Sequence, residues 1–142
     1  AWVSTELHLR ASSSREPASA MLALFGAEDA PARQFAAGLG LRALERPFYA
    51  LSQGEQKLVL VAAAVAATPR LLILDEVTQG LDAFYRKRVL DLAEAYSARC
   101  TLVFVTHHTD EHLPCLTHVL HLAKDSTPTY CGPWAGWDPH IT

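Results

Sequence analysis

The strongest constraint on the fold is a pair of short apolar runs, each of which ends in polar residues. Leu71 to Leu74 is followed by Asp75-Glu76, and Thr101 to Val105 is followed by Thr106-His107-His108. Consecutive apolar positions are typical of strands that are covered on both faces. Between the runs, residues 83–98 have the pattern of an amphipathic helix. This order predicts two buried strands in a parallel sheet, the first of them central, joined by a right-handed crossover, and hence an α/β fold.

A layer of helices is expected before this unit. Ser52 has Glu55 three residues on, which is the spacing of a capping box at a helix start. The apolar run Leu58 to Ala67 continues that helix until Pro69, so we expect it to be mostly buried. The pattern further predicts an extended segment over 1–9, helices over about 18–25 and 30–38, and strands over 119–122 and 129–131.

Length and composition exclude several classes of protein. The 142 residues suffice for one domain, and 50% hydrophobic against 19% charged residues permit a buried core. The net charge of −3 argues against a coat of positive charge for nucleic acid. The longest apolar run is ten residues, too short to cross a membrane. Three cysteines without close spacing favour a reducing compartment.

Polar side chains follow both predicted strands. In an open parallel sheet, ligands bind beyond the carboxyl ends of the strands, so Asp75-Glu76 and His107-His108 are expected to converge on one site. Neighbouring carboxylates there suit a divalent cation and a positioned water. Taken alone, the acidic pair is explained equally well as the solvated end of a strand.

A second candidate site is the helix start in Leu51-Ser52-Gln53-Gly54-Glu55-Gln56-Lys57. The free backbone N–H groups of a helix start and its positive dipole end attract anions. Gly54 would let an oxyanion approach the backbone closely. An ordinary capping box without a ligand is the alternative.

Four motifs in a fixed order carry a resemblance to a known family. Leu51 to Gln56 is similar to an LSGGQ-type signature, Leu71 to Glu76 to a Walker B strand, Gln79 to Asp82 to a D-loop, and Thr106-His107 to a switch-histidine loop. In this order they resemble the nucleotide-binding domain of ABC ATPases, with its P-loop NTPase-like sheet, over roughly residues 1–131. The motifs are most similar to those of tandem ATPases of the molybdate-uptake or photorepair type.

The resemblance implies a role for each matching residue. Asp75 would hold Mg²⁺ through water, Glu76 would act as general base or position the water, and His107 would bond the γ-phosphate of ATP. The signature residues would instead face an ATP bound on a second ABC ATPase domain, in a homodimer or a tandem pair. These residues are Ser52, Gln53, Gly54 and Glu55, and Asp82 would bridge the two sites.

Three departures from the family pattern qualify the resemblance. No G-x-x-x-x-G-K-[ST] loop occurs in the sequence, so we expect the 142 residues alone to be inactive and unable to hold ATP. Gln53 replaces a glycine of the signature, and Ala1 to Thr5 stand where the family places its glutamine loop. The simplest interpretation is a truncated chain that lacks its phosphate loop; true loss of the loop is the alternative.

The sequence therefore predicts a partial ABC ATPase domain with a helical subdomain over about 10–66, the C-terminal part of the ATP-binding core over about 67–131, and a tail over 132–142. We expect it to hydrolyse ATP as a subunit that drives import of a small solute, with a molybdate-type oxyanion as the candidate, together with a membrane permease. It would lie in the cytoplasm at the inner face of the plasma membrane, without direct contact to nucleic acid.

Two other functions stay open. The first is a soluble ABC-type ATPase of DNA repair or translation. The translation group carries N-H-L-D where this chain has Gln79-Gly80-Leu81-Asp82, which argues against this function. The second is an interaction domain that has lost hydrolysis. Intact Asp75, Glu76 and His107 argue against this second function.

Overall fold

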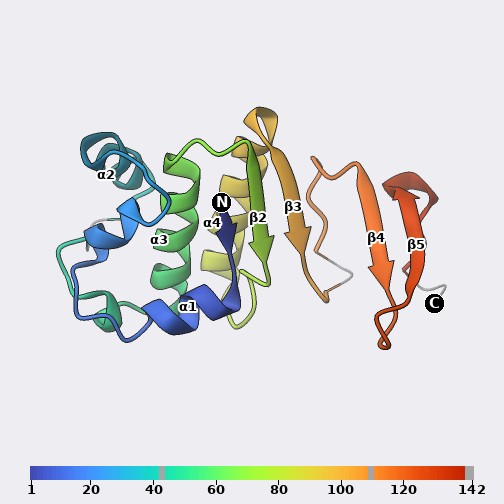
Figure 1. The fold of residues 1–142 in the computed structure, drawn as a ribbon, viewed down its shortest axis with the longest axis horizontal. Helices are drawn as coiled ribbons and strands as arrows, with labels where there is room; N and C mark the ends of the chain where they lie inside the picture. The colour runs from blue at the N-terminus through green and yellow to red at the C-terminus, as the bar shows by residue number, and fades with distance from the viewer. Residues whose placement is uncertain (42–43, 109–110, 140–142) are drawn as a thin grey trace. The chain divides into compact units, whose positions relative to one another are not determined.

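A central strand, β2 (Leu71–Asp75), organises the sheet. The computed structural model describes residues 1–41, 44–108 and 111–139. It divides into two compact units, Ala1–Thr106 and His107–Thr142. In the first unit β2 pairs in parallel with β1 (Trp2–Val3) and β3 (Thr101–Val105), in the order β1-β2-β3 (Figure 1). The α/β fold, the parallel sheet and the central place of β2 are confirmed.

Helices fill the rest of the first unit, and their bounds follow local signals in the sequence. Asp82 accepts a hydrogen bond from the backbone N–H of Tyr85 at 3.0 Å and so begins the helix that joins β2 to β3. The α-helices are α1 (Thr5–Ala11), α2 (Asp29–Gly38), α3 (Gln53–Ala66) and α4 (Ala83–Tyr96). The 3-10 helices of this unit are η1 (Ala18–Ala23), η2 (Phe48–Ala50) and η3 (Ser97–Arg99).

Helix α3 is the centre of the core. It contacts β1, β2, α2 and α4 (Figure 1). Every residue from Gln56 to Val65 is buried, which confirms the expected burial of the apolar run. The largest side chains that are fully buried in this unit come from α3, the sheet and the segments around them: Val3, Leu22, Phe48, Leu58, Val59, Leu60, Val61, Leu72, Leu74 and Val89.

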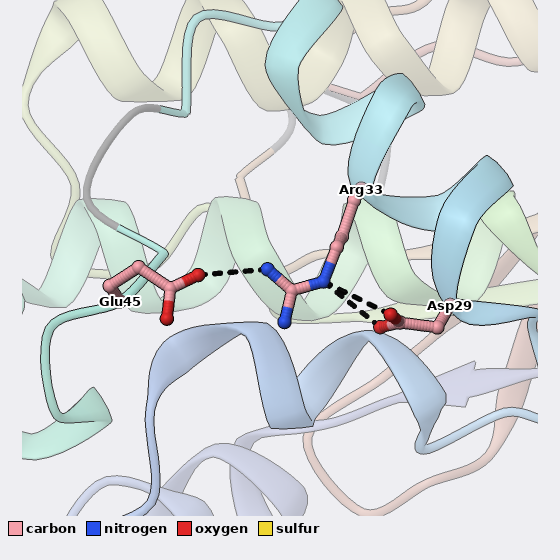
Figure 2. A network of polar contacts seen from close by, with 3 residues as sticks. All are labelled: Asp29, Arg33 and Glu45. Atoms are coloured by element: carbon pink, nitrogen blue, oxygen red, sulfur yellow. Dashed lines mark hydrogen bonds and ion pairs between the residues drawn. The ribbon is translucent and has the colours of Figure 1, made fainter.

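A network of hydrogen bonds and ion pairs lies on the surface at α2. Arg33 donates hydrogen bonds to Asp29 at 3.0 Å and to Glu45 at 2.8 Å (Figure 2). These hydrogen bonds, first that of Glu45 and then that of Asp29, raise the pKa of Arg33. The side chains are exposed to solvent, so the network adds little to the stability of the fold.

The amino-terminal segment differs from the prediction. Only Trp2–Val3 is a strand, and α1 follows at once, so the expectation of an extended segment over 1–9 was wrong. The physical reason is local: the hydroxyl of Ser4 accepts from the backbone N–H of Leu7 at 3.1 Å and caps the helix. An ion pair between Glu6 and Arg10, one turn apart, adds to it. The segment predicted as a helix over 18–25 is the 3-10 helix η1.

Strands β2 and β3 are both less buried than the sequence predicted. In β2 only Leu72 and Leu74 are buried, and Leu71 is 44% exposed. The side chains of β3 alternate between exposed and half-buried, and Val103 and Val105 are each 42% exposed. Within the described residues, β3 pairs with β2 on one edge and with no strand on the other. Phe84 on α4 is likewise 59% exposed. An apolar sequence indicates that a strand tends to be buried. Its actual exposure depends on which other segments pack against the strand.

The second unit contains an antiparallel pair. Strands β4 (His118–Leu122) and β5 (Pro128–Pro133) pair with each other, which confirms the two strands predicted near the end of the chain. Asp125 accepts from the backbone N–H of Thr127 at 3.0 Å in the turn between them, and this bond lowers the pKa of Asp125. A 3-10 helix, η4 (Trp134–Gly136), follows, and the rings of Trp134 and Trp137 meet edge to face.

Candidate functional site

Two acidic residues stand where β2 ends. Asp75 is the last residue of the strand and pairs in register with Val105. Glu76 leaves the strand with φ at +56°, in the left-handed region that side-chain-bearing residues seldom adopt. Its backbone N–H still donates to the carbonyl of Val105 at 2.9 Å. The chain thus turns sharply at Glu76 while the backbone stays tied to the sheet, which fixes where this residue leaves the strand.

The loop after Glu76 is ordered by backbone contacts. The N–H of Gln79 donates to the carbonyl of Glu76 at 3.2 Å, and that of Leu81 to the carbonyl of Thr78 at 3.2 Å. Thr78 is buried, and Gly80 adopts φ of +75°, which a glycine does without strain. Asp82 ends the loop as the cap of α4. The acidic pair is therefore followed by a short, well-defined connection.

The amino-terminal turn of α3 has a complete capping box. Ser52 accepts from the backbone N–H of Glu55 at 3.1 Å, and the Glu55 carboxylate accepts from the backbone N–H of Ser52 at 3.1 Å. This confirms the box that the spacing predicted. Ser52 and Gln53 are exposed, so both remain accessible at the start of the helix. That this turn contacts a nucleotide stays a prediction.

Gly54 has a structural role that the sequence did not indicate. A Cβ at this position would lie 2.5 Å from Cδ2 of Tyr85 on α4 and 2.6 Å from Cγ of the same ring. Contacts under 3 Å are repulsive, so only glycine lets α3 and α4 approach this closely. A close approach of an oxyanion, which we expected for Gly54, stays a prediction beside this packing role.

Lys57 is the residue of this region that sequence reasoning missed. It is 4% exposed, and its ammonium group donates to the backbone carbonyl of Gln79. Loss of solvent lowers the pKa of Lys57, and the negative charge of Glu76 opposes that shift. The available signal was a lone lysine at the edge of a long apolar run, a position where a charged residue requires a partner.

A small cavity lies beside the turn, lined among others by Leu51, Glu55, Tyr85 and Arg88. Its volume is about 60 Å³. Sites for drug-sized ligands are about 300 Å³ or more, so this cavity is too small for a nucleotide. The exposed surface of the turn is the better candidate for binding.

Comparison with known proteins agrees with this geometry. A family model described as "AAA domain, putative AbiEii toxin, Type IV TA system" matches residues 34–111, more than half of the chain. The ABC transporter ATP-binding protein ModF from Escherichia coli (strain K12) is 37% identical over 90 residues, which are 62% of this chain and 18% of ModF. The chain belongs to the AAA-domain family and is part of an ABC-type ATP-binding domain.

Two further similarities support this assignment. The uncharacterized ABC transporter ATP-binding protein YlmA from Bacillus subtilis (strain 168) is 39% identical over 116 residues, which cover 75% of this chain and 44% of YlmA. The solved structure of MJ1267, an ATP-binding cassette of an ABC transporter, matches 87% of this chain and 57% of its own length, with a TM-score of 0.67. At 16% identity that match shows the fold alone. The chain spans less than half the length of ModF and of YlmA.

Within this ABC-type domain, the first unit holds most of the predicted site residues. The hydrogen bond of Lys57 to Gln79 joins the start of α3 to the loop that follows the acidic pair. The seven residues in this unit are Ser52, Gln53, Gly54, Glu55, Asp75, Glu76 and Asp82. His107 belongs to the second unit, where its ring stacks on that of His108 with centroids 4.1 Å apart. Its contact with the γ-phosphate stays a prediction.

The ABC-type domain implies ATP, and its residues fit the metal that accompanies ATP only in part. Mg²⁺ prefers one or two carboxylates, with phosphate oxygens and waters completing an octahedron. Asp75 is such a carboxylate, at the carboxyl end of β2. Among residues 1–41, 44–108 and 111–139, no cluster of three histidine, cysteine or acidic side chains is arranged to hold a metal. The donor set therefore fits an ion shared with a nucleotide better than a resident metal.

None of the helices in the described part of the ABC-type domain combines the length and the apolar character that a membrane span requires.

Proposed function

We propose that this chain contributes to two ATP sites of an ABC-type ATPase. The acidic pair at the end of β2 serves hydrolysis at one site, and the start of α3 binds the γ-phosphate at the other. The observation that carries the proposal is the sharp turn at Glu76, which places a carboxylate beyond the carboxyl end of the central strand. Ligands of open parallel sheets bind at this edge.

Each residue has a defined task in phosphoryl transfer. Bound Mg²⁺ would neutralise the charge that develops on the phosphates, and Asp75 would hold it through a water molecule. Glu76 orients the attacking water and accepts its proton. For His107, the resemblance implies a hydrogen bond to the γ-phosphate. The protein contributes positioning and electrostatic stabilisation, because this reaction requires little covalent chemistry from it.

The α3 turn serves the ATP of a second ABC ATPase domain, from another copy or from a tandem domain. Ser52, with Gln53, Gly54 and Glu55, would face that γ-phosphate with the positive end of the helix dipole behind it. Asp82 would bridge the two sites. Because the sequence has no G-x-x-x-x-G-K-[ST] motif, the phosphate-binding loop has to come from outside these 142 residues.

The proposed biological task is transport. The matched relatives ModF and YlmA are named ABC transporter ATP-binding proteins. We extend this to an ATP-hydrolysing subunit that works with a membrane permease at the inner face of the plasma membrane. Import of a small solute, with a molybdate-type oxyanion as the first candidate to test, is the form that the resemblance favours.

The decisive test is Glu76→Gln in the full-length protein. This change keeps the size of the side chain and removes its ability to take a proton, so turnover should fall by about 10²- to 10⁴-fold while ATP stays bound. Steady-state hydrolysis and equilibrium binding of ATP measure the two effects. Glu6→Gln, on the exposed face of α1, is the matched control and should leave the rate unchanged. Unchanged hydrolysis in Glu76→Gln would refute the assigned role.

A further inference from the structure

Lys57 is a charged side chain in a buried place. It is the fifth residue of α3, is 4% exposed, and has its ammonium group on the backbone carbonyl of Gln79. A buried ammonium group is costly unless it has both a hydrogen-bond acceptor and an opposite charge nearby. The Gln79 carbonyl is the hydrogen-bond acceptor. The group that supplies the opposite charge therefore indicates the role of Lys57.

The opposite charge is Glu76. Its negative charge opposes the lowering of the Lys57 pKa that burial causes. Lys57 therefore lies within electrostatic reach of the acidic residue at which the strand turns, and it is bonded to the loop three residues further on. One side chain of α3 is thus hydrogen-bonded to the backbone of this loop and attracted by the charge of Glu76.

Two neighbouring contacts also bring the first turn of α3 against Gly80 of the loop and against the start of α4. A Cβ on Gly80 would lie 3.3 Å from both the amide nitrogen and the amide oxygen of Gln53. Gly54 packs against Tyr85, just after the loop. Of these three contacts, only that of Lys57 brings a charge to the acidic end of the strand.

We propose that Lys57 is a positioning residue that holds the Glu76–Gln79 segment against α3, so that the Glu76 carboxylate keeps its place while Ser52 on the same helix engages nucleotide. The inference rests on the proposed function, because it assigns Glu76 to hydrolysis and Ser52 to the second ATP. It adds a link between the two sites within one chain. The link consists of the hydrogen bond from Lys57 to the Gln79 carbonyl and the attraction between the Lys57 and Glu76 charges.

The test uses the full-length protein and steady-state hydrolysis of MgATP. Lys57→Met keeps the length of the side chain and removes its charge. It should lower kcat about tenfold to a hundredfold, because a displaced reacting group costs that much, with KM changed by no more than about twofold. Lys57→Arg, which keeps the charge, should restore part of the loss. Lys87→Met on α4, where the lysine side chain is 76% exposed, is the matched control and should behave as the unchanged protein.

A double variant separates positioning from a merely structural role. If Lys57 acts through Glu76, Lys57→Met in a Glu76→Gln background should slow single-turnover hydrolysis no further. A purely structural role would instead lower the unfolding temperature and add its effect to that of Glu76→Gln. If Lys57→Met does not fold, Lys57→Gln retains a donor for the Gln79 carbonyl, and the same two readouts apply to it.

The outcomes are distinguishable from those of the proposed function. Normal turnover in Lys57→Met or Lys57→Gln, with Glu76→Gln inactive, would overturn this inference and leave the proposed function standing. Additive losses would likewise overturn it. Normal turnover in Glu76→Gln would overturn the proposed function itself.

Discussion

Helices α3 and α4 are equally long but differ in how much of each is buried. Each has 14 residues, a side-chain cap at its start and a contact with the other. In α3 every residue from Gln56 to Val65 is buried, whereas α4 buries only Val89, Leu92, Ala93 and Tyr96. Helix α3 is thus buried on all sides from Gln56 to Val65, whereas α4 is amphipathic, with one face exposed to solvent.

The lysines of the two helices show what this difference means for function. Lys87 on α4 pairs with Asp91 at 2.6 Å, one turn away, and its side chain is 76% exposed. Such pairs on a helix surface contribute about 0.3–0.5 kcal/mol. Lys57 on α3 has no such freedom, because burial ties it to the loop that follows Glu76. Lys87 therefore contributes charge to the solvated surface of α4, whereas Lys57 helps to hold the loop against α3.

The largest expected effect separates the two helices by core packing. Leu60→Ala on α3 removes a fully buried side chain and should lower the free energy of unfolding by about 2–5 kcal/mol, measured by chemical denaturation. Phe84→Ala on α4 removes a larger side chain that is 59% exposed, and it should cost less than about 1.5 kcal/mol. Similar losses for both would mean that α3 is not the core helix.

A smaller effect is expected at the contact between the helices. Gly54→Ala places a Cβ 2.5 Å from the Tyr85 ring and should cost about 1–3 kcal/mol through forced repacking. Gly38→Ala, near the end of α2, meets nothing within 4 Å and should change stability by less than about 1 kcal/mol. Equal stability of the two variants would show that α3 and α4 can separate freely.

The smallest effect concerns pH and sharpens the comparison of the lysines. Burial lowers the pKa of Lys57 in the folded chain, whereas in the unfolded chain it is about 10.4. At a pH between these two pKa values, the unfolded state therefore binds more protons than the folded state. The stability of the unchanged chain, measured against Lys57→Met, should therefore rise as pH increases toward that unfolded value. The stability difference from Lys87→Met is the reference. A difference for Lys57→Met that falls with pH would contradict the direction of the shift.

The sequence predicted the local features well. The Ser52 and Glu55 pair was enough to predict a capped helix, and the apolar run after it was enough to predict its burial. The strand that ends at Asp75 and its parallel partner were confirmed for the same reason: short-range patterns report secondary structure directly. The α1 helix was missed although its capping signal, Ser4, was present.

Features that depend on contacts between distant segments could not be predicted in this way. Gly54 meets a ring 31 residues later in the chain, and Lys57 meets a carbonyl 22 residues later. The exposure of Val103 depends on what covers β3, which its own apolar sequence does not state. The positions of the candidate site residues followed from the motifs, whereas the lysine that joins two of those motifs required the packing of α3.

The fit between Gly54 and Tyr85 makes the two positions share one volume. A larger residue at 54 is tolerated only if the residue at 85 shrinks, so tolerated substitutions at these positions should occur as matched exchanges of size. A library that randomises both codons together would recover such compensating pairs, whereas a scan of single changes would record position 54 as nearly invariant and leave the reciprocal tolerance unseen.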